Sequence, residues 1–223
     1  MADCATGRGT LSVAVMTPHL VIQPTREDWR LAREVHSHFR ARPGSQHIAT
    51  AFALAHLAAL LRVLPVKSVL EFGAGIGTIT FLLQERLPAD GRIVCAERNA
   101  WCREQFAINI PQSPRVALIP EGRPHLTDPF DLVIIDGPIT PGAQYVRAGT
   151  ACFVEGNRNG PWSMFADGLS AQGLVCHRTN YPAKGFRIRW RMSRLGLNLP
   201  RLRRTKGCWI GVVAESDSTP MVR

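Results

Sequence analysis

The stretch Val69-Leu-Glu-Phe-Gly-Ala-Gly-Ile-Gly77 joins a short apolar run to a turn that contains three glycines. Residues 68–72 are typical of a buried strand, and residues 78–87 are typical of a helix. Glycines let the backbone approach a ligand closely, and the first turn of a helix offers unpaired N–H groups. The stretch therefore predicts a ligand-binding turn between the first strand and a helix of an α/β domain.

The spacing of the glycines bears on which ligand the turn binds. A dinucleotide fingerprint, Gly-x-Gly-x-x-Gly, requires a glycine at position 78, where this chain has Thr78. Glu71 would face a pyrophosphate unfavourably, but it suits a ligand with an ammonium and a sulfonium centre. Glu97 follows the next predicted strand, where a carboxylate can accept hydrogen bonds from ribose hydroxyls. Glu121 follows the third predicted strand, at a position that suits an adenine edge.

Apolar runs that alternate with helices continue on both sides of this stretch and predict a parallel sheet covered on both faces. A further helix is expected over residues 99–108, and the long connection before the last strand could form an antiparallel return. The predicted strands after the first are 92–96, 116–119, 132–135, 151–154, 174–177 and 208–213.

Two helices are predicted before the first strand. Thr25 and Asp28 resemble a capping pair, and apolar residues then recur at helical spacing until Arg42-Pro-Gly44. Residues 46–63 form an apolar run with Ser45 as its expected cap. We therefore divide the chain into an N-terminal arm and helix, residues 1–44, and a main domain, residues 45–223.

Two segments carry a family resemblance. Residues 69–77 resemble the first motif of class I S-adenosylmethionine-dependent methyltransferases, and Phe130-Asp-Leu-Val-Ile-Ile-Asp-Gly137 resembles their fourth-strand motif. The resemblance implies an α/β, Rossmann-like fold, which is a seven-stranded, mostly parallel sheet of order 3-2-1-4-5-7-6 flanked by helices. It also implies that residues 45–223 are a methyltransferase domain that binds S-adenosylmethionine across the carboxyl ends of the first strands.

The resemblance further assigns residues to parts of the cofactor. Glu71 and the glycine turn would border the methionine part, Glu97 would hold the ribose, and two residues after the third strand would lie beside the adenine. Asp136, at the end of the fourth strand, is the best-placed carboxylate for catalysis and would also border the cofactor. The cofactor-binding residues expected in this way are Glu71, Gly73, Ala74, Gly75, Gly77, Glu97, Glu121, Gly122 and Asp136.

A metal site is the less favoured expectation. In small-molecule O-methyltransferases that resemble catechol methyltransferase, the position of Asp136 and an Asp-Asn pair after the fifth strand hold a divalent metal. This chain has Glu155-Gly-Asn-Arg158 there, so Glu155 and Asn157 could replace the pair only with a shifted register. Oxygen ligands would suit Mg²⁺, but the departure from the pattern argues against it.

The acceptor is expected to be an oxygen of a small polar or phenolic molecule. The Asn/Asp-Pro-Pro-aromatic signature of amino-methylating relatives is absent after the fourth strand. Two alternatives stay open: an RNA methyltransferase that uses the basic segment 184–206, and a binding subunit that keeps the cofactor pocket without catalysis. The short connection 138–149 suggests an open site or one completed by another subunit, as in a homodimer.

Composition fits a globular protein with a sizeable core: 45% of the 223 residues are hydrophobic and 20% are charged. The six cysteines include no Cys-x-x-Cys pair and are expected to be reduced core residues. No apolar run reaches a membrane-spanning length, so we expect a cytoplasmic protein without a membrane partner. The net charge of +10 lies largely in residues 184–206, which can contact phosphates or lipid headgroups but are also typical of a solvated surface hairpin.

Overall fold

The computed structural model describes residues 20–120, 129–137, 143–156, 159–183, 186–192, 198–204 and 207–216. The helices are α1 (Arg26–Arg40), α2 (Ala51–Val63), α3 (Thr78–Arg86), α4 (Ala100–Asn109) and α5 (Asn159–Ser170), with 3₁₀ turns η1 (Ser45–His47) and η2 (Ala143–Tyr145). The strands are β1 (Ser68–Phe72), β2 (Arg92–Ala96), β3 (Val116–Ile119), β4 (Leu132–Ile135), β5 (Ala151–Glu155), β6 (Leu174–Tyr181), β7 (Phe186–Met192), β8 (Asn198–Arg204) and β9 (Cys208–Glu215).

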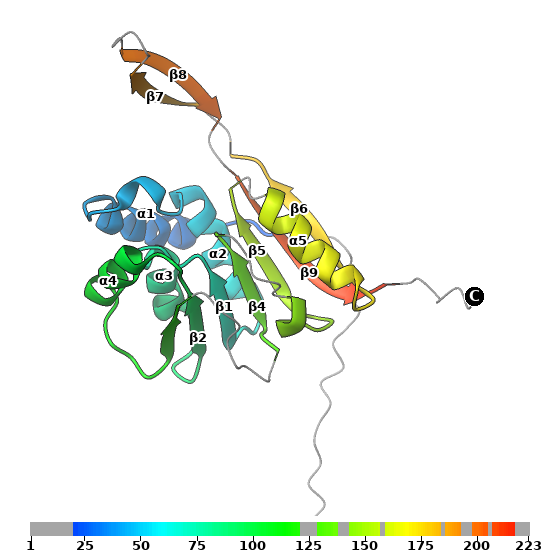
Figure 1. The fold of residues 1–223 in the computed structure, drawn as a ribbon. Helices are drawn as coiled ribbons and strands as arrows, with labels where there is room; N and C mark the ends of the chain where they lie inside the picture. Colours follow the sequence, from blue (N-terminus) through cyan, green and yellow to red (C-terminus); the bar gives the residue numbers. More distant parts are fainter. Residues whose placement is uncertain are drawn as a thin grey trace, which may run out of the picture.

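Seven of these strands form one sheet in the order β3-β2-β1-β4-β5-β9-β6 (Figure 1). The strands β1 to β5 pair in parallel, whereas β9 runs antiparallel to both β5 and β6. The last strand of the chain therefore inserts between the fifth and the sixth. This is the predicted Rossmann-like order, and the prediction of a seven-stranded, mostly parallel sheet is confirmed.

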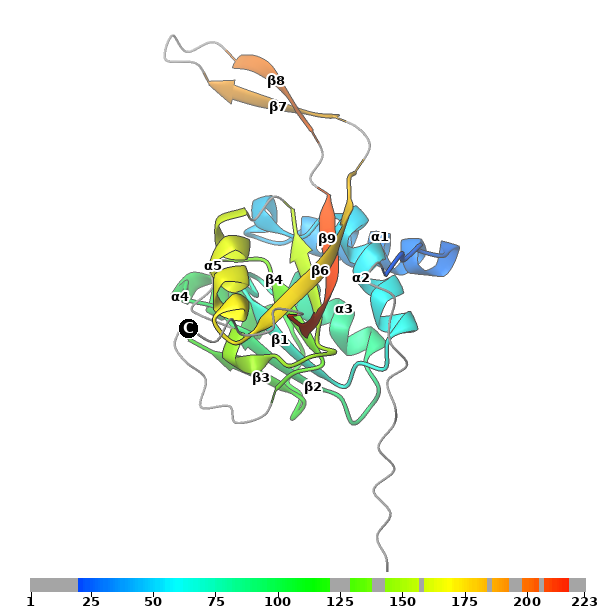
Figure 2. The same cartoon turned by 90° about the vertical axis from the view of Figure 1, so that its right-hand side faces the viewer.

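Side chains alternate between the two faces of the sheet, and in the central strands those on both faces are apolar. Helices therefore cover both faces. One face, which includes Val69 of β1 and Phe153 of β5, packs against α1, α2 and α3. The other face, which includes Leu70 and Val154, packs against α5 and η2. Figure 2 shows α5 on the opposite side of the sheet from α1 and α2.

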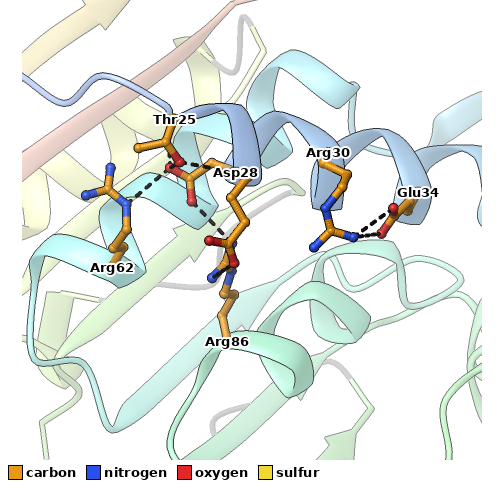
Figure 3. A network of polar contacts seen from close by, with 7 residues as sticks. Thr25, Asp28, Arg30, Glu34, Arg62 and Arg86 are labelled. Carbon is orange, nitrogen blue, oxygen red and sulfur yellow. Dashed lines mark hydrogen bonds and ion pairs between the residues drawn. The ribbon is translucent and has the colours of Figure 1, made fainter.

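The N-terminal helix α1 is fixed by a buried carboxylate. Asp28 closes a capping box with Thr25 at the first turn of α1, as the sequence predicts. The same carboxylate accepts hydrogen bonds from Arg62 of α2 at 3.2 Å and from Arg86 of α3 at 3.3 Å (Figure 3). Burial opposes the ionisation of Asp28, but the hydrogen bonds from Thr25 and the charge of Arg62 outweigh it and lower its pKa. One side chain therefore joins α1 to both helices beneath it.

The predicted helix over residues 46–63 is wrong in its first part. Residues 45–47 form the 3₁₀ turn η1, and α2 begins only at Ala51. The physical reason is a second cap, because the Thr50 hydroxyl accepts a hydrogen bond from the N–H of Ala53 at 3.2 Å. The non-helical residues between η1 and α2 then become available to line a cavity.

The sixth strand is longer than predicted, because β6 pairs with β9 along eight residues, from Leu174 to Tyr181. Its burial alternates along much of its length, as on an edge strand, so the apolar pattern ends after four residues while the pairing continues. Beyond it, β7 and β8 form a separate antiparallel hairpin that precedes β9.

The end of β6 also holds the segment before α1. The Tyr181 hydroxyl accepts a hydrogen bond from the N–H of Ile22 at 2.7 Å and donates one to the carbonyl of Leu20 at 2.9 Å. The five cysteines that the structure describes are free, as expected. Within the described parts of the chain, no helix is both long and apolar enough to cross a membrane.

Candidate functional site

A cavity of about 360 Å³ lies at the carboxyl ends of β1, β2 and β4. This is where ligands bind in open α/β sheets, because the loops at that edge leave a crevice. Its lining includes the glycine turn after β1, Glu97 after β2 and Asp136 after β4. The structure therefore brings Gly73, Ala74, Gly75, Glu97 and Asp136 together around one cavity, whereas Glu71 and Gly77 do not line it.

The three glycines of the turn all have positive φ but meet different surroundings. A Cβ on Gly73 would lie 2.6 Å from the backbone nitrogen of Gly137, and a Cβ on Gly77 would lie 2.5 Å from the side chain of Ile110. These two glycines allow close packing of β1 on β4 and of α3 on α4. Gly75 has nothing within 4 Å of an added Cβ and lines the cavity. Of the three, Gly75 is the one that leaves room for a ligand.

Both carboxylate oxygens of Glu97 accept hydrogen bonds from backbone N–H groups. Its Oε2 accepts a hydrogen bond from the N–H of Gly75 at 2.8 Å, and its Oε1 accepts one from the N–H of Asn99 at 2.8 Å. Asn99 in turn caps α4 through the N–H of Cys102. The side chain of Glu97 is therefore fixed at the cavity wall, and each carboxylate oxygen keeps a second lone pair for a ligand hydroxyl.

Glu71 lies behind the turn rather than in the cavity wall. It is 0% exposed and is not among the lining residues. Its Oε2 accepts hydrogen bonds from the Thr80 hydroxyl at 2.6 Å and from the Cys95 thiol at 3.5 Å. Burial raises the pKa of Glu71 to about 7, with the nearby charge of Glu97 acting in the same direction. Strand alternation explains this position, because odd-numbered residues of β1 face α3.

Two buried polar atoms near the turn lack a hydrogen-bond partner among the described residues: Glu71 Oε1 and the hydroxyl of Thr78. Thr78 is the first residue of α3 and lines the cavity. Buried polar groups without partners are rare in folded proteins and call for a ligand or a water molecule. Of the two residues, Thr78 lines the cavity and can offer its hydroxyl to a bound molecule, whereas Glu71 lies behind the turn.

Asp136 follows β4 directly and is half-buried at the cavity. Its N–H donates to the carbonyl of Phe72 at 2.9 Å, which continues the pairing of β1 and β4 by one residue. The carboxylate is thus placed by rigid sheet structure, on the opposite side of the glycine turn from Glu97.

The remaining predicted residues are not brought to the cavity by the described structure. Glu121, Gly122 and Asn157 lie outside the described residues. Glu155 ends β5, is buried, and does not line the cavity. Burial, reinforced by the charge of Glu155, raises the pKa of Cys208 on the adjacent strand. Within the described ranges, no three His, Cys, Asp or Glu residues cluster closely enough to hold a metal ion.

The sequence interpretation missed one wall of the cavity. The connection between α1 and α2 contributes Gly44, Gln46 and Ile48, and α4 contributes Trp101. A Cβ on Gly44 would lie 2.8 Å from the Trp101 ring, so this connection packs against the indole. Trp101 is 43% exposed in the first turn of α4. The signal available in the sequence was an aromatic residue four positions after Glu97.

Comparison with known proteins identifies the fold. A SAM-dependent O-methyltransferase from Thermotoga maritima is similar at a TM-score of 0.55 and 12% identity, over 84% of this chain and 72% of that chain. A candidate O-methyltransferase from Klebsiella pneumoniae reaches 0.53 and 19%, over 86% and 91%. The precorrin-6y C5,15-methyltransferase from Geobacter metallireducens reaches 0.51 and 12%, over 78% and 93%.

Neither a family model nor a curated protein matches this sequence. At these identities the similarity is one of fold, and this chain has the fold of these methyltransferases. The expectation drawn from the two sequence motifs is therefore confirmed at the level of architecture.

Proposed function

We propose that this chain is a methyltransferase that binds S-adenosylmethionine in the cavity at the carboxyl ends of β1, β2 and β4. The observation that carries the proposal is the single cavity lined by Gly75, Glu97 and Asp136, which follow three different strands. The fold supports it, because the similar structures named above are those of methyltransferases.

The residues present fit this cofactor. The cavity volume of about 360 Å³ lies within the range of small-molecule sites. The open space beside Gly75 admits a ligand against the backbone, and Glu97 suits a ribose because a carboxylate accepts hydrogen bonds from two hydroxyls. Thr78 lines the cavity, and its hydroxyl, which has no partner among the described residues, suits the polar methionine end.

The chemistry follows from what each residue can do. S-adenosylmethionine, when bound, supplies a methyl group on a positively charged sulfur for in-line displacement. Glu97 and the glycine turn orient the cofactor, and the rigid positions of both limit motion of the reacting centre. Asp136 is the group that we assign to the acceptor, where its carboxylate would accept the hydroxyl proton as the oxygen attacks.

We further propose that the acceptor is an oxygen atom of a small polar or phenolic molecule and that the reaction takes place in the cytoplasm. Asp-Gly-Pro-Ile follows β4 in place of the motif that holds amino groups in nitrogen-methylating relatives. Two of the similar structures are described as O-methyltransferases, which agrees with this choice. The residues that we assign need no metal ion, because Asp136 itself can act as the base.

The substitution Asp136→Asn tests the assignment. We expect turnover on phenolic and polyhydroxylated acceptors, measured as release of S-adenosylhomocysteine, to fall by about 100-fold or more, as is typical when a general base is lost. Binding of S-adenosylmethionine, measured by calorimetry, is expected to change far less.

Asp167→Asn is the matched control, since Asp167 is exposed on α5 and does not line the cavity. Equal turnover by Asp136→Asn and the wild type would exclude the catalytic assignment. Cofactor binding without turnover on any acceptor would instead favour a binding subunit.

A further inference from the structure

The β7–β8 hairpin is the part of the molecule that the proposed function does not use. It projects away from the seven-stranded sheet in both views (Figures 1 and 2). Among the described elements, β7 and β8 pack chiefly on each other. A two-stranded hairpin alone is marginally stable in water. A partner that contacts the hairpin would therefore add to its stability.

The register of the hairpin separates its residues by chemistry. Residues directly opposite each other in an antiparallel pair share a face, and neighbours along a strand alternate between faces. One face, here called the arginine face, contains Arg187, Arg189, Arg191, Arg201 and Arg203, with Leu199. The other, here called the apolar face, contains Phe186, Ile188, Trp190, Met192, Pro200 and Leu202, with Asn198 and Arg204 at its two ends.

The arginine face carries like charges at facing positions. Arg187 is paired with Arg203, and Arg189 with Arg201. Like charges opposite each other destabilise a strand pair, and neither strand contains an acidic residue that would compensate. An anionic partner removes this repulsion. The pattern therefore favours a polyanionic surface on this side of the hairpin.

The apolar face requires a partner that offers an apolar surface as well as negative charge. By register, six apolar residues share one face of the hairpin, and soluble proteins normally cover an extended apolar patch. Nucleic acid would satisfy the arginine face and could stack on aromatic residues, but it offers no hydrocarbon to the aliphatic residues of the apolar face. A second copy of the chain packed on the apolar face would leave the arginine pairs without an anion. Addition of a strand at the β8 edge is also disfavoured, because Pro200 lacks an N–H.

We propose that the β7–β8 hairpin binds the surface of an anionic lipid bilayer. Hydrocarbon and phosphate lie side by side at such a surface, where the headgroup layer is about 5–7 Å thick on each side of the core. The apolar face would lie at the acyl boundary, and the long stems of arginine can reach phosphates from the opposite face. This proposal is independent of the reaction proposed above.

Vesicle sedimentation of the full-length protein tests the proposal. We expect the wild type to bind vesicles containing phosphatidylserine, to bind phosphatidylcholine vesicles much more weakly, and to lose binding as salt is raised. A basic residue near such a surface contributes about fivefold to binding, so R189Q/R201Q should bind anionic vesicles about 25-fold more weakly.

Trp190→Ser provides a second measurement and should also weaken vesicle binding, because Trp190 lies on the apolar face. The matched control is R33Q/R40Q, which removes the same charge from exposed positions of α1 and should bind as the wild type does.

Several results would overturn the proposal. One is wild-type binding to anionic vesicles by R189Q/R201Q, and another is a wild type that binds no vesicles. Salt-sensitive retention of an RNA oligonucleotide without vesicle binding would assign the hairpin to nucleic acid. A dimer that Trp190→Ser converts to a monomer, again without vesicle binding, would assign it to a second copy of the chain.

Discussion

Glu71 combines full burial with a carboxyl group that has one oxygen without a partner among the described residues. Its pKa, raised from 4.5 to about 7 by burial, means that the folded protein binds a proton that the unfolded chain releases. The contribution of Glu71 to stability is therefore unfavourable above pH 4.5 and grows until about pH 7. The shift corresponds to about 3 kcal/mol at neutral pH.

Glu71→Gln should remove this dependence, because glutamine has the same shape and does not ionise. We expect the free energy of unfolding of the variant, measured in urea, to fall less steeply than that of the wild type between about pH 5 and pH 7. The control is Glu85→Gln, at an exposed position of α3. Parallel pH profiles for Glu71→Gln and the wild type would show that Glu71 ionises normally in the folded protein.

Some residues of the candidate site could be located from the sequence, and others could not. The order of residues placed Gly75, Glu97 and Asp136 after three strands, and the sheet brings them to one cavity. It did not place Glu71 correctly relative to the cavity, because strand alternation turns this side chain toward α3. Nor did it find Trp101, because its neighbour in the cavity wall, Gly44, is distant in sequence.

Helix α1 is held in place by the carboxylate of Asp28, which bonds to one arginine on each of two neighbouring helices. Asp28→Asn keeps a side-chain oxygen that can accept from the N–H of Thr25 but removes the charge that faces Arg62 and Arg86. Because Arg62 is 40% exposed, we expect a loss of about 2 kcal/mol, less than for a fully buried pair. Urea unfolding measures it, with Glu34→Gln on the exposed side of α1 as a nearly neutral control.

The pH dependence of this network has the opposite sign to that of Glu71. The pKa of Asp28 is lower in the folded protein than its ordinary value of 3.8. Its stabilising contribution is therefore complete above that value and is lost as the pH falls through the folded pKa. If Asp28→Asn and the wild type lose stability equally on acidification below about pH 4, the ion pairs do not hold α1.

Helix boundaries and strand lengths were predictable where local chemistry set them. The capping box at Thr25 marks the start of α1, and the apolar runs mark the five parallel strands. The start of α2 was not predictable from the sequence, because Thr50 and Ser45 can both cap a helix. In the folded protein the cap is Thr50. The length of β6 depends on pairing with β9, a distant segment.

For the whole molecule, the structure predicts that the hairpin is separable from the sheet. Tyr181 and Cys208 are paired neighbours on β6 and β9, on either side of the hairpin. Replacing residues 184–206 by Asn-Gly would close β6 and β9 with a short loop of a kind common in hairpins. We expect cooperative thermal unfolding with a midpoint within a few degrees of that of the full-length chain. Loss of cooperative unfolding would mean that the hairpin supports the sheet.

The order of the seven strands was implied by the resemblance of two motifs to a known family, and the structure confirms the predicted fold class. Residues 184–206 were interpreted from the sequence as a basic surface hairpin, but charge alone does not reveal which of its residues share a face. The register of β7 and β8 supplies that information and separates the arginines from the apolar residues. Composition was therefore compatible with an anionic partner or with a solvated surface, whereas the register of the hairpin supports a partner with both an anionic and an apolar side.

Calorimetric titration with S-adenosylmethionine measures whether the cavity beside Gly75 binds this cofactor. We predict binding at one site per chain by the wild type, and at least about 100-fold weaker binding by Gly75→Val, whose side chain would fill the open space. Gly149→Val controls for backbone strain, since Gly149 also has positive φ and open surroundings but lies outside the cavity. Equal affinity of Gly75→Val and the wild type, or no binding by the wild type, would contradict the account.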